Sequence, residues 1–359
     1  IALDIEADRM RNCRIDDKHE FQQEKGAVIS ELKGGEDQPW DLEYKAILPR
    51  LFDKADPYSH PVIGEEEHVR AATAEIIKRY YDQWYHPNNA TIVIVGGFEP
   101  ESALAKVKEL FGTIPKAELP NRVPTPAASL RTKQVRHQFE SKFDVPRAMV
   151  GFNTVAVGDA DDYVFDVISQ VLSGGRTSRL YRTLVEKEQL CGDVSADSNA
   201  GRYPGWFGVN LEMLAGKDRG KAEKLMFAEL KKLADAPITD AELKRVRQNI
   251  IASYIFSRES AHSLCDYIAK CVTYKDLDYL TTYLDKAMAV TPDDIQRVAK
   301  KYFDENAAVV VWSVPNSWSI SMANRDWKGS SNGSCRSGKV RFPSGSSFEI
   351  VRAIKILSF

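Results

Sequence analysis

A repeated helix–turn–strand pattern is the feature that most restricts the fold of this chain. Residues 73–95 (TAEIIKRYYDQWYHPNNATIVIV) resemble residues 291–312 (TPDDIQRVAKKYFDENAAVVVW). Both segments start with a threonine suited to cap a helix, carry an acidic residue two places before an isoleucine, break at an asparagine and continue into β-branched residues. Because these signals agree in order, they favour an internal duplication over a chance similarity. The sequence therefore predicts an α+β protein of two repeated modules, each a mainly antiparallel β-sheet backed by helices.

A proline-rich stretch marks the expected boundary between the modules. Residues 115–126 contain four prolines, which exclude a helix or a central strand. We expect a first module over 1–114, a linker over 115–126, a second module over 127–315 and a tail over 316–359. The stretch 316–338 is polar and rich in Gly and Ser, which is typical of a linker. The last residues of the tail alternate like a strand for which the sequence offers no partner.

Hydrophobic periodicity predicts the regular elements of both modules. The first module is expected to hold helices at 17–33, 40–52, 73–85 and 101–111 and a buried strand at 90–96. In the second module, the segments HQFESKF, PRAMVGFNTV and GWFGVNLEML have the pattern of strands. Helices are expected there at 162–172, at three long stretches (218–235, 239–271 and 275–288) and at 291–303, which leads into a strand at 307–313.

The start of the chain has the pattern of a helix that is already under way. Ile1, Leu3, Ile5 and Met10 are interleaved with acidic residues, and neither an initiator methionine nor a capping residue precedes them. A domain rarely begins in the middle of a helix. We therefore expect the natural protein to begin upstream of Ile1.

Charge, hydropathy and cysteine usage exclude several classes of protein. Lys and Arg total 49 against 51 Asp and Glu, so the net charge of −2 gives no reason to expect nucleic acid or an anionic membrane as a partner. No apolar run is long enough to span a bilayer. The five cysteines form no CxxC pair, and their odd number predicts neither a disulfide framework nor a cysteine zinc site.

The histidines form no self-contained metal motif. None of the six lies in HExxH, HxxEH or another close pair. His60 and His86 each precede a proline in a turn and are expected to be structural. P-loop and GxGxxG patterns are also absent from the sequence, so it does not suggest a nucleotide-binding protein.

Glu24 and Glu31 are the pair of acidic residues that merits attention. Seven residues on an α-helix complete almost two full turns, so the two carboxylates project from one face of the helix expected at 17–33. In such a pair one carboxylate can bind a metal while the other orients it or steers a water. Two glutamates at this spacing also occur commonly on a solvated helix face, and the residues alone leave both interpretations open.

Several motifs taken in order resemble the pitrilysin/insulinase/processing-peptidase family of zinc metallopeptidases, the M16 family. The run EKGAVISE from Glu24 to Glu31, followed by DQP, resembles the segment that supplies the third zinc ligand in that family. LDIEADRM before it, and DPYSHPVIG, YHPNNATIVIVGGFEP and FGTIP after it, appear in the order of the family. In the second module LSGGRTSRLYRTLVEKEQL and ITDAELKRVRQNI are similar to later family motifs. The resemblance covers about residues 1–315.

The resemblance implies the LuxS/processing-peptidase-like metallohydrolase fold and a zinc-dependent endopeptidase of the inverted-motif class. In that family the two histidines of HxxEH and a later glutamate hold Zn²⁺, and the glutamate between the histidines acts as general base. Carried onto this chain, Glu31 matches the third zinc ligand and Glu24 the accessory catalytic carboxylate. The HxxEH helix, with the two histidines that complete the site, is expected upstream of Ile1. The 359 residues alone are therefore expected to be inactive.

The same resemblance implies peptide substrates and pairing as a homodimer, a heterodimer or with a second M16 half. Two other functions stay open. One is a non-catalytic subunit of the same fold, and the other is a peptide-binding scaffold without hydrolysis. Retention of both Glu24 and Glu31 favours the catalytic type, and an HxxEH upstream would distinguish it from the other two. The compartment is not determined; in a bacterium it would be the periplasm or the cytoplasm.

Overall fold

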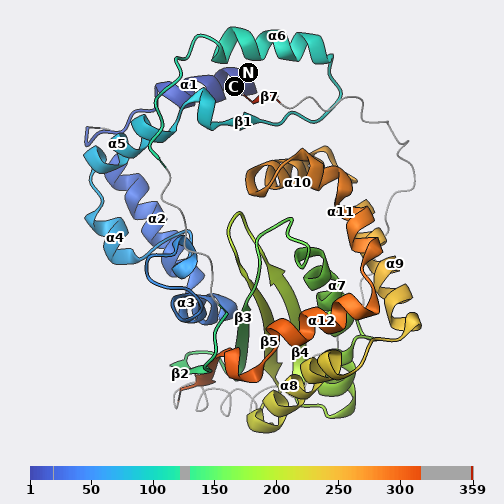
Figure 1. Ribbon diagram of the computed structural model, residues 1–359. Helices are drawn as coiled ribbons and strands as arrows, with labels where there is room; N and C mark the ends of the chain where they lie inside the picture. Colours follow the sequence, from blue (N-terminus) through green and yellow to red (C-terminus); the bar gives the residue numbers. More distant parts are fainter. Residues whose placement is uncertain (19, 122–129, 317–356, 359) are drawn as a thin grey trace, which may run out of the picture.

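The structure has a helical N-terminal part that extends as an arc beside a body built on one β-sheet (Figure 1). This computed structural model describes residues 1–18, 20–121, 130–316 and 357–358. Its mixture of helices with one five-stranded sheet confirms the α+β class. Residues 122–126 of the expected linker and most of the expected tail lie outside the described residues.

The N-terminal part consists mainly of helices. They are α1 (Ala2–Arg11), α2 (Phe21–Gly35), α3 (Pro39–Leu51), α4 (Glu66–Ala71), α5 (Ala74–Trp84) and α6 (Pro100–Phe111). Short 3₁₀ turns lie at Pro57–Ser59 (η1) and Pro87–Asn89 (η2). The helices expected at 17–33, 40–52, 73–85 and 101–111 are thus confirmed to within a few residues.

The expected strand at 90–96 is shorter than predicted. Only β1 (Thr91–Ile92) is a strand, and it pairs antiparallel with β7 (Leu357–Ser358). A strand needs a partner for its backbone groups, and among the described residues β1 has only this two-residue partner. The side chains that follow nevertheless alternate between two sides, as in a strand. Ile92 and Ile94 pack with α1 and α6, while Val93 and Val95 pack against α10 and α11.

The sheet of the second module has the strand order β2-β6-β3-β5-β4. The strands are β2 (Val135–Ser141), β3 (Arg147–Asn153), β4 (Cys191–Asn199), β5 (Trp206–Met213) and β6 (Val309–Pro315). Only the β2–β6 pair is parallel, so the sheet is mainly antiparallel as expected. Every residue of β3 is buried, because helices cover both faces of the sheet at this strand.

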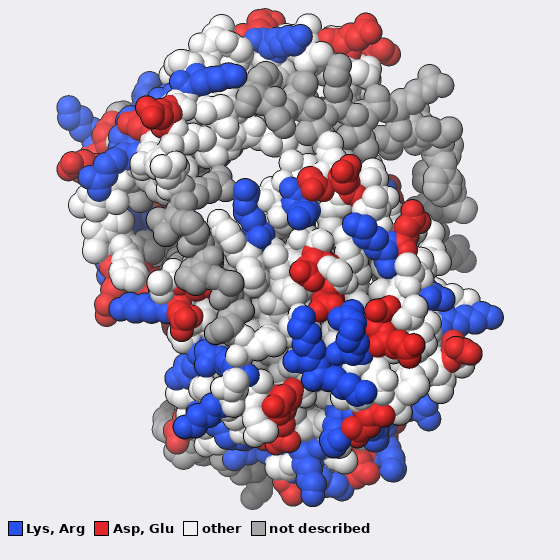
Figure 2. Space-filling model, viewed as in Figure 1, with Lys and Arg blue, Asp and Glu red and all other residues white. Residues whose placement is uncertain are grey.

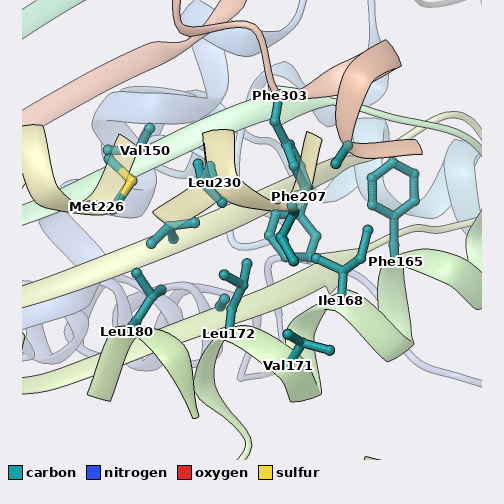
Figure 3. Close-up of a cluster of buried hydrophobic side chains, with 14 of the residues drawn as sticks. Val150, Phe165, Ile168, Val171, Leu172, Leu180, Phe207, Met226, Leu230 and Phe303 are labelled. Atoms are coloured by element: carbon teal, nitrogen blue, oxygen red, sulfur yellow. The ribbon is translucent and has the colours of Figure 1, made fainter. Parts of the chain in front are cut away.

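The principal hydrophobic core lies between this sheet and the helices on one of its faces. Those in contact with it include α7 (Asp162–Ser173), α8 (Arg219–Asp235) and α12 (Pro292–Tyr302). Phe165, Phe207 and Phe303 meet at its centre (Figure 3), with ring centroids 5.1–6.1 Å apart. Aromatic rings at such distances add to the free energy that their burial contributes.

Two helices replace the single stretch expected at 239–271, and the prediction of one continuous helix is wrong. The chain forms α9 (Asp240–Phe256) and α10 (Ala261–Tyr274), followed by α11 (Leu277–Ala289). Ser260 starts α10 because its side chain accepts a hydrogen bond from the backbone N–H of Ser263. This capping signal lies inside an otherwise helical pattern, which explains why periodicity alone did not detect the break.

The opposite face of the sheet is covered by α3, which belongs to the first module in sequence. Ile47 and Leu51 of α3 pack on Trp206 and Met149 of the sheet. A Cβ atom added to Gly151 on β3 would lie 3.0 Å from side-chain atoms of Ile47, Leu51 and Trp206. Glycine at this position therefore permits the close approach of α3 and the sheet.

The two repeated segments have the same local structure. Thr73 caps α5 and Thr291 caps α12, each through its side-chain oxygen. A 3₁₀ turn follows each helix, η2 at Pro87–Asn89 and η4 at Glu305–Ala307, and a strand follows each turn. That the two whole modules superpose stays a prediction, as do their boundaries.

Candidate metal centre

Helix α2 carries both glutamates on a side that faces away from its packing contacts. Leu32 is its buried residue, and Lys25 donates hydrogen bonds from Nζ to the carbonyl oxygens of Arg70 (3.0 Å) and Ala72 (3.1 Å). Glu24 and Glu31 each precede one of these packed residues in the sequence, which turns them about 100° away from the packed face. Both carboxylates are consequently exposed.

No described side chain engages either carboxylate. Glu24 and Glu31 make no hydrogen bond or ion pair with the described residues, unlike Glu66 nearby, whose carboxylate lies 3.3 Å from Lys33 Nζ. Seven residues of helix place their Cα atoms about 10 Å apart along the axis. Because zinc–oxygen bonds are only about 2 Å long, this spacing suits one direct ligand and one accessory carboxylate better than two ligands of one ion.

The described residues do not build a complete zinc site by themselves. No group of three or more His, Cys, Asp or Glu side chains converges anywhere in the described ranges. His86 is buried and its Nε2 lies 2.6 Å from the carbonyl oxygen of Asp82, while His60 Nδ1 lies 3.1 Å from that of Pro61. Both contacts are with backbone carbonyl groups nearby in the sequence, so these histidines stabilise local structure. An exposed carboxylate is a suitable oxygen donor, but Glu31 supplies only one.

Two of the sequence motifs meet where α1 packs on α5. The hydroxyl group of Tyr81 donates to the carbonyl oxygen of Arg9 (2.8 Å) and accepts from the backbone N–H of Cys13 (3.3 Å). Arg11 donates to the carbonyl oxygen of Tyr85 at 3.1 Å. A groove of about 570 Å³ lies beside this contact. The LDIEADRM and YHPNN motifs, distant in sequence, are therefore adjacent in the fold.

Charged side chains of both signs are scattered over the visible surface. In Figure 2, Lys and Arg are interspersed with Asp and Glu among larger areas of other residues. In the part of the chain that the structure describes, no helix combines the length and apolar character required to cross a bilayer.

Two carboxyl–phenol pairs between α7 and α11 were not predicted from the sequence. Tyr279 donates its hydroxyl proton to Asp162 Oδ2 (3.2 Å), and Tyr283 donates to Asp166 Oδ2 (2.7 Å). Burial raises the pKa of Asp162 to about 6 and that of Asp166 to about 7. The signal was present in the sequence, because both the aspartates and the tyrosines are spaced four residues apart, which places each pair on one helix face.

These raised pKa values predict how stability depends on pH. Between about pH 4 and pH 7 the folded protein binds more protons at Asp162 and Asp166 than the unfolded chain, so the free energy of unfolding falls as the pH rises through this window. Asp166→Asn should remove part of this slope and raise the free energy of unfolding at pH 8 by about 2 kcal/mol. Urea unfolding at pH 5 and pH 8 measures both effects.

Asp285→Asn is the matched control, because Asp285 lies exposed on α11. This variant should retain the pH slope of the parent. If the free energy of unfolding depends on pH equally in Asp166→Asn and in the parent, the proposed titration of Asp166 is contradicted.

Comparison with solved structures shows the class of protein that this fold defines. The chain is similar to a protease from Helicobacter pylori, with a TM-score of 0.79 and 23% identity over 88% of this chain and 76% of that one. It is also similar to a peptidase M16 inactive domain from Pseudomonas fluorescens, with a TM-score of 0.74 and 18% identity over 88% and 74% of the two chains. The fold is that of M16-type peptidases.

The sequence comparisons agree with the fold. The family model described as "Peptidase M16 inactive domain" matches residues 71–250. The chain therefore belongs to the M16 peptidase family, as its motifs indicated. An uncharacterized zinc protease of Streptomyces coelicolor is 25% identical over 305 residues, which cover 84% of this chain and 66% of that protein. Zinc protease PqqE of Helicobacter pylori is 25% identical over 334 residues, which cover 88% and 71% of the two proteins.

Proposed function

We propose that this chain is part of a zinc-dependent endopeptidase of the inverted-motif class, with Glu31 as the third zinc ligand and Glu24 as the accessory carboxylate. The observation that carries the proposal is the pair of exposed carboxylates on one side of α2, which make no hydrogen bond or ion pair with the described residues. They occupy the positions that correspond to the family's ligand segment. The relatives named zinc proteases support a metal-dependent reaction.

The chain supplies one zinc ligand in this proposal and leaves the others to an HxxEH segment. Zinc held there would act as a Lewis acid toward the scissile carbonyl and would lower the pKa of a water toward about 7. Glu31 would contribute a negative charge to the ion. Glu24, about two turns away, would act through the surroundings of the metal rather than as a direct ligand.

A non-catalytic half of the same fold is the second candidate. The matching family model carries the description "inactive domain" and covers residues on both sides of the linker expected at 115–126. A structural relative of this chain is a component of complex III2 from Candida albicans. That likeness, at 13% identity, supports the fold alone, so the choice between the candidates depends on the presence of HxxEH upstream.

Zinc binding and peptide cleavage by two forms of the protein test the proposal. The 359-residue chain should bind zinc weakly and cleave no peptide, because Glu31 is the only family ligand within it. A longer form that includes an upstream HxxEH should bind zinc tightly and cleave an unstructured peptide in a chelator-sensitive manner. Tight zinc binding and chelator-sensitive cleavage by the 359 residues alone would show the ligand assignment to be wrong. An upstream sequence without HxxEH would favour the non-catalytic half.

A further inference from the structure

A cavity of about 380 Å³ lies between α7, α9, α10 and α11, on the helical side of the second module. Four tyrosines and one carboxyl group contribute to its wall: Tyr254, Tyr267, Tyr279, Tyr283 and Asp166. Three serines and one glutamine also line it, together with a single aliphatic residue. Among the described residues that line the cavity there is no lysine or arginine, so its fixed charge is negative or zero.

The tyrosine rings are arranged so that a cation between them would contact more than one aromatic face. The rings of Tyr254 and Tyr283 are nearly parallel, with an angle of 9° between their planes and 6.5 Å between their centroids. Tyr267 stands at 82° to Tyr254, and Tyr279 lies 5.6 Å from Tyr283. A cation within about 6 Å of a ring centroid is attracted by the negative face of the ring.

Two of these tyrosine rings already contact a cationic side chain of the protein. The guanidinium carbon of Arg258 lies 3.4 Å from the centroid of Tyr254 and 4.7 Å from that of Tyr267. Arg258 does not line the cavity, and its positive charge opposes a second cation nearby. The two carboxyl groups of α7, Asp162 and Asp166, provide the larger and opposite charge when they are ionised.

Asp166 is the group in the cavity wall whose carboxylate favours a cation. Its Oδ2 accepts the hydrogen bond from Tyr283, while no described residue provides a partner for Oδ1. No basic group in the described part of the chain pairs with the carboxylate, and burial raises its pKa to about 7. A bound cation would supply the missing charge and a hydrogen-bond donor for Oδ1.

We propose that this cavity is a binding site for a primary ammonium or guanidinium group, as carried by a lysine or arginine side chain of a peptide or by a free amine. The serine hydroxyl and glutamine amide oxygens accept hydrogen bonds, which favours cations with N–H donors over quaternary ammonium groups. The site lies apart from α2 and requires no zinc. Its existence is therefore independent of the peptidase proposal.

Binding of small probes to the 359-residue chain, labelled with ¹³C in its tyrosine rings, tests this site by NMR. Nα-acetyl-lysine-N-methylamide and the corresponding arginine compound should shift the signals of the cavity tyrosines. The norleucine analogue, which lacks the charge, should not. Butylamine distinguishes the sources, since weaker binding of butylamine than of the blocked lysine assigns the site to peptides and equal binding assigns it to free amines. Equal shifts with norleucine, or none with any cation, would overturn the proposal.

Substitution of the carboxyl group provides the second arm of the test. Asp166→Asn keeps the side-chain volume and an acceptor for Tyr283 but removes the charge, so it should weaken binding of the blocked lysine about 10- to 100-fold. Asp285→Asn on α11, outside the cavity, should leave the affinity unchanged. An Asp166→Asn variant that is folded and binds with the parent's affinity would exclude the site.

The pH dependence separates a charge contact from a purely steric one. Because a proton and the cation compete for Asp166, the affinity should fall about 30-fold between pH 8 and pH 5.5. Lysine keeps its charge throughout this range, and burial places the raised pKa values of Asp162 and Asp166 within it. Further titratable and charged groups face the carboxyl. These groups are Asp162 on α7, Tyr254 and Arg258 on α9, Tyr267 and Cys271 on α10, and Tyr279 and Tyr283 on α11. A flat profile would contradict the role given to Asp166.

Discussion

Glu31→Gln in the protein that includes an upstream HxxEH should weaken zinc binding by more than about 100-fold, which exceeds the losses usual for a residue that acts on a metal indirectly. The amide keeps the shape of the side chain but removes the negative charge that a direct ligand provides to Zn²⁺, and an amide is a poor replacement for a carboxylate. Metal content after dialysis and the rate of peptide cleavage should fall together.

Glu24→Gln is the matched control for this prediction, because it makes the same chemical change on the same exposed side of α2. It should retain much of the zinc while turnover falls on the order of 10- to 100-fold, as is typical of residues around a metal's ligands. Full zinc content in Glu31→Gln would show that the third ligand lies elsewhere. Equal zinc loss in the two variants would contradict the distinction between ligand and accessory residue.

Phe165→Ala should destabilise the second module by about 3–5 kcal/mol, the largest loss expected for a single core residue. Phe165 is fully buried and its ring contacts Phe207, Tyr302 and Phe303 at centroid distances of 5.0–6.1 Å. Truncation removes this buried surface and leaves a cavity that the neighbours from the sheet and from the end of α12 cannot fill without moving. Denaturant unfolding monitored by circular dichroism measures the loss.

Phe256→Ala provides the control, because Phe256 at the end of α9 is 64% exposed. It should change the free energy of unfolding by no more than about 0.5 kcal/mol, as is usual for surface positions. Phe165→Leu, which restores most of the volume, should recover much of the stability. Similar losses for the alanine variants at positions 165 and 256 would mean that the core between α7 and the sheet is not the principal source of stability.

Local signals along the chain were sufficient for most of the helices. Thr73 and Thr291 were identified as caps from the sequence, and each accepts the expected backbone hydrogen bond. The placement of Glu24 and Glu31 on one side of a helix also followed from the sequence, because the geometry of an α-helix depends only on residue spacing. The family was recognised in the same way, since its motifs depend on order along the chain.

The sequence by itself thus determined the features that depend on neighbours in the chain: the helices, their caps and the common face of Glu24 and Glu31. Only the tertiary structure decided which distant groups meet. It placed Asp162 and Asp166 against Tyr279 and Tyr283, and α3 against the sheet at Gly151. It also divided residues 92–95 between two clusters, one with α1 and α6 and one with α10 and α11. The physical reason is that burial, charge compensation and strand pairing depend on partners far away in sequence, which periodicity and capping signals do not specify.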